Sequence, residues 1–128
     1  MTTPYTHVPI DDVRDAAPDF GAGDIQQIRF ANDALETEQT GFTHHRLEPG
    51  VRPNFAHRHQ EAEEIYVVLS GSGRLRLDDE IVELEPMDAV RVAAKVTRAF
   101  EADDEGLEIL AFGRRHEGDG EIVPDFWT

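Results

Sequence analysis

The feature that most constrains the fold is a series of short apolar or alternating segments, separated by turn residues about every eight to twelve positions from residue 25 onward. Alternation with a period of two places successive side chains on opposite faces of a strand. Strands of this length and spacing are typical of β-sandwiches and barrels, so the chain is predicted to be all-β. The predicted strands are residues 25–30, 41–48, 54–59, 64–70, 73–77, 80–84, 89–93, 96–102, 107–113 and, more weakly, 121–123.

Turn residues set the expected connections. Gly71-Ser72-Gly73 and Asp78-Asp79 are predicted to be compact turns between hairpin strands, because Gly and Asp tolerate positive φ. Residues 32–38 form the one plausible helix. Residues 1–23 are rich in Pro and Asp and show no sustained periodicity, which predicts an extended N-terminal arm with at most one short helical turn near residues 11–16. Residues 24–128 would form the barrel.

Charge excludes some partners. The 128 residues include 27 acidic and 12 basic side chains, for a formal charge of −15. Nucleic acids and anionic membrane surfaces are bound largely through Lys and Arg, so neither is an expected partner. Lys95 is the only lysine. This composition fits either adaptation to a salt-rich cytosol, as in a halophile, or an arginine-favouring codon bias.

The absence of cysteine excludes disulfides, thiolate metal sites and Cys nucleophiles. The longest strictly apolar run covers only residues 65–69, and residues 1–10 lack the basic-then-apolar order of a signal peptide. A cytoplasmic location is therefore expected. Any chemistry must use His, carboxylate or Arg side chains.

The strongest functional pattern lies between residues 57 and 64. On a strand, His57 and His59 point to the same face, and Glu64 begins the next apolar strand. Two imidazoles and one carboxylate match the ligand set that binds divalent iron and leaves coordination positions open. The same set accepts Mn, Ni, Co or Zn, so the pattern predicts a site for a divalent metal of unspecified identity.

These residues resemble the first motif of the cupin superfamily: Gly, about five residues, His-x-His, three or four residues, Glu, six residues and Gly. His57, His59, Glu64 and Gly71 match its spacing, and Gly50 lies one position early. The resemblance covers roughly residues 41–113. It implies a double-stranded β-helix (jelly-roll) barrel, a metal in the lumen, a small-molecule ligand and, as in many cupins, a homodimer.

The second cupin motif, which supplies the family's fourth metal ligand, has changed at all five of its defining positions. Met87, Ala93, Lys95, Arg98 and Ala102 stand where the family has Gly, Pro, Gly, His and Asn. Arg98 cannot ligate a metal because its guanidinium stays protonated and has no lone pair.

Two arrangements of Arg98 are open. It either turns aside or binds an anionic substrate while His57, His59 and Glu64 hold a metal, or it pairs with Glu64 and creates a metal-free pocket for a small anionic ligand. The first predicts a cupin that binds a divalent metal and a small polar molecule, with no reaction specified and catalysis itself undecided. The second predicts a binding module. A third possibility is an interaction module with a vestigial pocket.

Two further residues are candidates for ligand binding. His44 and His45 are adjacent on one strand, so they face opposite ways; Leu47 favours an inward His45, whereas Phe42 favours His44. Tyr66 shares a strand face with Glu64, so its hydroxyl can reach the lumen. For the inward histidine and for Tyr66, packing with one satisfied hydrogen bond is the simpler interpretation.

Overall fold

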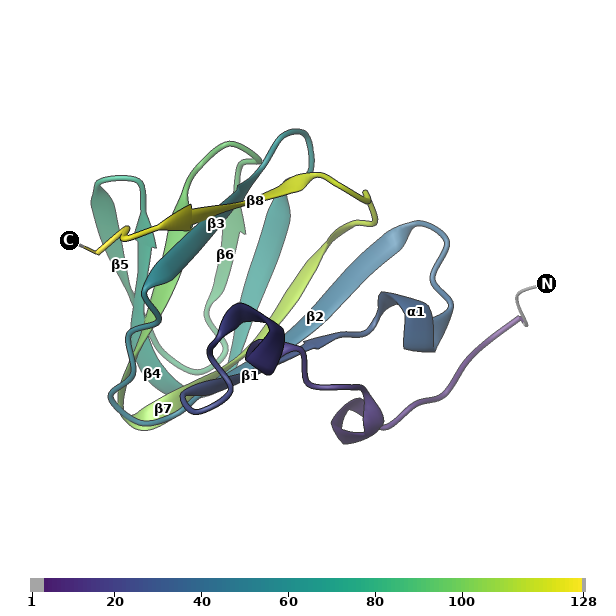
Figure 1. Cartoon of the computed structure of the whole chain (residues 1–128), viewed down its shortest axis with the longest axis horizontal. Coiled ribbons are helices and arrows are strands. Elements are labelled where there is room, and N and C mark those ends of the chain that lie inside the picture. Colours follow the sequence, from purple (N-terminus) through teal and green to yellow (C-terminus); the bar gives the residue numbers. More distant parts are fainter. Residues whose placement is uncertain (1–3, 128) are drawn as a thin grey trace.

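The computed structural model describes residues 4–127 and shows a curled antiparallel sheet with little helix (Figure 1). The all-β prediction is confirmed. The helical elements are two 3-10 turns, η1 (Ile10–Asp12) and η2 (Ala17–Phe20), and α1 (Asn32–Leu35). The strands are β1 (Gln26–Phe30), β2 (Thr40–Leu47), β3 (Phe55–His59), β4 (Glu64–Leu77), β5 (Glu80–Leu84), β6 (Ala89–Val92), β7 (Arg98–Arg114) and β8 (Gly120–Pro124).

Strand β7 organises the sheet. It pairs with β2, β3 and β4, and β4 in turn pairs with β5 and β6. Strands β1 and β8 lie at the two ends of the path β1-β2-β7-β3-β8. Strand β3 pairs with β7 at His57 and Arg98, and β3 together with the start of β4 carries the predicted metal ligands.

The predicted turn at Gly71-Ser72-Gly73 is wrong. Strand β4 continues through these residues, with register shifts against β7 between Val68 and Ser70 and between Gly71 and Gly73. A Cβ on Gly71 would lie 2.0 Å from the Gly106 carbonyl oxygen, and one on Gly73 would lie 2.0 Å from the Glu101 carbonyl oxygen. These glycines therefore serve the close approach of two strands at a β-bulge, a role that shares its residue preference with a turn.

Two more predicted strand boundaries are absent from the structure. Predicted strands 64–70 and 73–77 are one strand, β4, and predicted strands 96–102 and 107–113 are one strand, β7. The predicted hairpin turn at Asp78-Asp79 is present between β4 and β5, with Asp78 at φ 53°. The predicted helix over residues 32–38 is only the four residues of α1.

The core is built from the inward faces of β4 and β7, where Tyr66, Val68, Leu75 and Ile109 are at most 1% exposed. A second small cluster joins the N-terminal segment to β1 through Ala17, Ala22 and Ile28.

The N-terminal segment is tied to β1 by hydrogen bonds as well as by that cluster. The Asp15 carboxylate accepts backbone N–H groups of Ala17 and Ile28, both at 2.9 Å. The Ala16 N–H also donates to the Ile28 carbonyl at 2.7 Å. The segment holds two 3-10 turns rather than the single turn expected near residues 11–16, and the second one, η2, lies against β1.

We expect Gly73→Ala to lower the free energy of unfolding by about 2–4 kcal/mol, because the new Cβ must push the Glu101 carbonyl out of the ladder. Gly120→Ala is the matched control, since a Cβ on this strand glycine would meet nothing closer than 3.7 Å. Urea denaturation of both variants checks this. Equal stabilities would contradict the role of Gly73 in strand approach.

Candidate metal centre and its cavity

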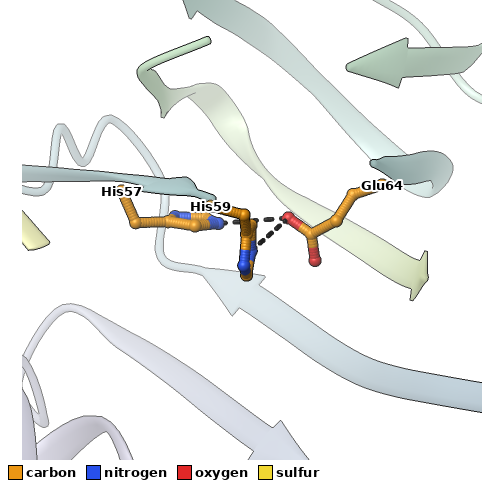
Figure 2. Close-up of side chains that lie close together, drawn as sticks. All are labelled: His57, His59 and Glu64. Atoms are coloured by element: carbon orange, nitrogen blue, oxygen red, sulfur yellow. Dashed lines mark hydrogen bonds and ion pairs between the residues drawn. The ribbon is translucent and has the colours of Figure 1, made fainter. Parts of the chain in front are cut away.

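Strands β3 and β4 bring three potential ligands together. His57 and His59 project from the same face of β3, and Glu64 is the first residue of β4 (Figure 2). Glu64 Oε1 lies 3.2 Å from Nε2 of each histidine. One ligand atom from each residue lies within 4.8 Å of the others, so the three could hold a metal ion.

The donor set fits a divalent metal. Both ring nitrogens of His59 are buried, and each lies 3.2 Å from a carboxylate oxygen without a well-aligned hydrogen bond, which leaves room for a better partner such as a metal ion. Burial lowers the pKa of His57, which keeps its imidazole in the neutral form that ligates. Two neutral imidazoles and one carboxylate suit Fe, Mn, Ni, Co or Zn.

Glu64 is shared between these histidines and two other groups. The Tyr66 hydroxyl donates to Glu64 Oε1 at 2.6 Å, and Arg98 Nη2 donates to the same oxygen at 2.7 Å. Although burial raises the pKa of Glu64, the contacts with His57, His59 and Tyr66 outweigh it and hold this pKa well below its usual range. These contacts all converge on one oxygen atom, Oε1.

Arg98 is fixed behind Glu64. Its side chain is fully buried, Nη1 donates to the carbonyls of Ala94 at 2.9 Å and Val96 at 2.8 Å, and Nε donates to the Tyr66 hydroxyl at 3.1 Å. Arg98 therefore pairs with Glu64 instead of turning aside. Its direct contact with a ligand stays a prediction, as does that of Tyr66, because neither residue lines the cavity in front of the three ligands.

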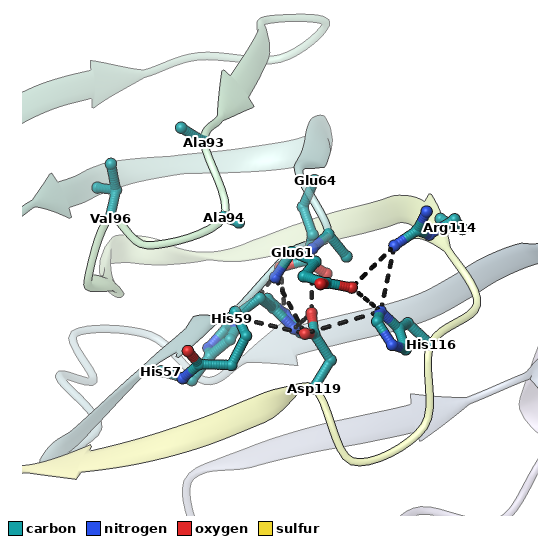
Figure 3. A network of polar contacts seen from close by, with 12 residues as sticks. His57, His59, Glu61, Glu64, Ala93, Ala94, Val96, Arg114, His116 and Asp119 are labelled. Atoms are coloured by element: carbon teal, nitrogen blue, oxygen red, sulfur yellow. Dashed lines mark hydrogen bonds and ion pairs between the residues drawn. The ribbon is translucent and has the colours of Figure 1, made fainter.

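Sequence reasoning missed Asp119, which lies between His59 and His116 (Figure 3). Its carboxylate accepts the backbone N–H groups of Gln60, Glu61 and Ala62 and thereby holds the loop between β3 and β4. Asp119 Oδ2 also lies 3.2 Å from His59 Nδ1. A carboxylate beside the outer nitrogen of a ligating histidine orients that ring. A single Asp between two glycines gives no local signal of this distant contact.

A cavity of about 410 Å³ opens in front of the site. His45, His57, His59 and Glu64 line it. His44 faces the other way, where its Nε2 contacts Glu108 Oε2 at 2.7 Å. His45 is therefore the histidine that faces the cavity, as the position of Leu47 on the same strand face predicted. Gly113 allows the close approach of the backbone that leads into Glu64, since a Cβ there would lie 2.9 Å from the Glu63 carbonyl oxygen.

This fold and site define a jelly-roll barrel with a possible metal centre. The family model for the cupin domain matches residues 43–113, more than half of the chain. The chain therefore belongs to the cupin family. A comparison with curated proteins finds no match. No helix within residues 4–127 is long and apolar enough to cross a membrane.

Solved structures support the same fold. The polyketide cyclase RemF from Streptomyces resistomycificus aligns with a TM-score of 0.74 and 18% identity, over 100% of this chain and 88% of that one. A cupin protein from Bacteroides fragilis gives 0.70 and 22%, over 91% and 89%. A cupin-superfamily sugar phosphate isomerase from Silicibacter pomeroyi gives 0.69 and 19%, over 92% of each chain. Because all three sequence identities are below 25%, these comparisons show a similarity of fold alone.

The lowered pKa of His45 makes the stability of the folded protein depend on pH. Desolvation by the surrounding barrel, followed by the nearby His57, lowers it to about 4 from an ordinary value of 6.5. Between these values the unfolded chain takes up a proton that the folded chain does not, so the contribution of His45 to stability is present above pH 6.5 and lost as pH falls towards 4.

From pH 7 to pH 5 we expect His45 to account for about 1–2 kcal/mol of lost unfolding free energy. Denaturant titrations at both pH values should show a smaller loss in His45→Gln than in the wild type. Replacement of the exposed His7 by Gln is the control and should follow the wild type. An unchanged pH dependence in His45→Gln would contradict the assignment.

Proposed function

We propose that this cupin holds a divalent metal between His57, His59 and Glu64 and binds a small molecule with a polar group in the adjoining cavity. The observation that carries the proposal is the convergence of two imidazoles and one carboxylate at a cavity. The buried Nε2 of His59 supports it, because this atom has no well-aligned hydrogen bond to Glu64 and a bound ion would satisfy it.

A metal held there would supply Lewis-acid chemistry, polarising an oxygen of the bound molecule. The residues of the chain would divide the remaining tasks. His45, neutral near pH 7, would hydrogen-bond the polar group of the ligand. Tyr66 and Arg98 would fix the carboxylate of Glu64, and Asp119 would orient His59.

The alternative proposal is a metal-free binding module, and the Arg98–Glu64 ion pair is the observation that favours it. The buried guanidinium neutralises the carboxylate, so the pair is stable without a metal. An anionic ligand would however compete with Glu64 for a cation whose Nε and Nη1 already donate to Tyr66 and to backbone carbonyls. The geometry therefore supports the metal-binding proposal more strongly.

Elemental analysis separates the two proposals. Protein purified without chelator and without an affinity-tag metal should contain close to one equivalent of a transition metal, and His57→Ala and His59→Ala should lose it because each removes one of three donors. His44→Gln is the matched control, since His44 faces away from the cavity. A wild-type protein that stays metal-free after incubation with Fe, Mn, Ni, Co and Zn salts would refute the metal site.

Arg98→Gln tests how Arg98 influences the metal. The substitution removes a positive charge that lies 2.7 Å from Glu64 Oε1 and would repel a metal cation bound to that carboxylate. We therefore expect the dissociation constant for Mn²⁺ to fall by roughly tenfold or more. Calorimetric titration measures it, and a thermal melt confirms that the variant folds. Weaker binding in a folded variant would contradict this expectation and would show that the loss of Glu64 positioning outweighs the removed charge.

A further inference from the structure

The mouth of the cavity is aromatic. Phe20 stacks on Phe55, with ring centroids 5.9 Å apart and an interplanar angle of 20°, and Phe30 lies 6.2 Å from Phe20. Phe20, Phe30 and Ile122 are 38%, 51% and 49% exposed, and all of them line this one cavity. Exposed apolar side chains that gather at a concave site mark a binding surface, because folding alone favours their burial.

The aromatic mouth is assembled from separate parts of the chain. Phe20 ends η2, Phe30 ends β1, Phe55 begins β3 and Ile122 lies in β8. The N-terminal segment that carries Phe20 is held in place by buried Ala17 and Ala22 and by the hydrogen bonds of Asp15. Phe20 is thus held at the mouth by packing and hydrogen bonds beneath it, and its ring stays partly open to a ligand.

The cationic side chains at the rim already have acidic partners. Arg114 Nη2 lies 3.6 Å from Glu61 Oε2, and Arg115 Nη2 donates to Asp33 at 2.6 Å. Arg98 is outside the cavity lining and is paired with Glu64. Both arginines that line the cavity in residues 4–127 therefore have carboxylate partners. A phosphate or carboxylate group would therefore meet guanidinium groups whose charge is already balanced.

We propose that the small molecule of this site is an uncharged aromatic compound whose flat ring system lies against Phe20, Phe30 and Phe55, with a hydroxyl or carbonyl group directed to His45 and the metal ligands. The proposal rests on the small-molecule site proposed above and names its ligand class. The volume of about 410 Å³ is in the range of ligand pockets and accommodates such a compound. Aromatic rings gain from offset stacking on one another beyond the area that they bury.

Calorimetric titration with 2-naphthol and with glucose 6-phosphate tests the ligand class. We expect 2-naphthol to bind to both metal-loaded and chelator-treated protein, and glucose 6-phosphate to bind at least tenfold more weakly. Phe20→Ala and Phe20→Leu should each weaken 2-naphthol binding by roughly three- to tenfold, because Leu restores apolar area without a ring. Phe126→Ala is the control, since Phe126 packs under Arg76 away from the cavity.

Metal content, measured in the same samples, keeps the two proposals apart. Binding of 2-naphthol by a protein that takes up no metal would refute the metal centre and leave the aromatic site standing. Tighter binding of glucose 6-phosphate, or unchanged 2-naphthol binding in both Phe20 variants, would overturn the aromatic site. The aromatic site would also be overturned if light scattering shows that the wild type is a dimer and that Phe20→Glu is a monomer, because a second copy of the chain would then cover the mouth of the cavity.

Discussion

One carboxylate oxygen, Glu64 Oε1, is the point on which the candidate site depends. It receives hydrogen bonds from Tyr66 and from the buried guanidinium of Arg98, and it lies 3.2 Å from the Nε2 atoms of both His57 and His59. A buried carboxylate is costly unless it is paired, and removal of one partner of such a pair typically costs about 3–5 kcal/mol. Arg98 therefore stabilises the same group that a metal would use, which couples the folding of the barrel to the charge of its site.

The long pairing of β4 with β7 makes this arrangement possible. Glu64 lies opposite Gly113 near one end of the ladder, and Arg98 lies opposite Leu77 at the other. The bulge at Gly71–Gly73 lets the two strands curl, and the curled sheet brings the side chain of Arg98 back to Glu64. Position 98 also pairs with His57 on β3, so the first and second motifs meet at one cross-strand contact.

Local pattern was enough to predict most strands, the shared face of His57 and His59, and the approach of Glu64, because alternation and short spacing determine them. It did not reveal the bulge, because glycine is favoured in bulges and turns alike. It also missed Asp119, whose contacts with His59 and with the loop between β3 and β4 lie 57 to 60 positions away in sequence and depend on where β8 pairs. The two arrangements of Arg98 could be separated only by seeing which partner it reaches.

We propose that Glu64 serves Arg98 and a metal at the same time. A crystal structure of the Mn²⁺-soaked protein, with anomalous differences recorded near the manganese edge, tests it most directly. We expect one anomalous peak that lies within bonding distance of the Glu64 carboxylate and of Nε2 of both His57 and His59. Arg98 should keep its hydrogen bond to the same carboxylate. The proposal would be contradicted by a structure that has no anomalous peak among His57, His59 and Glu64 and in which the Arg98 guanidinium occupies the expected metal position.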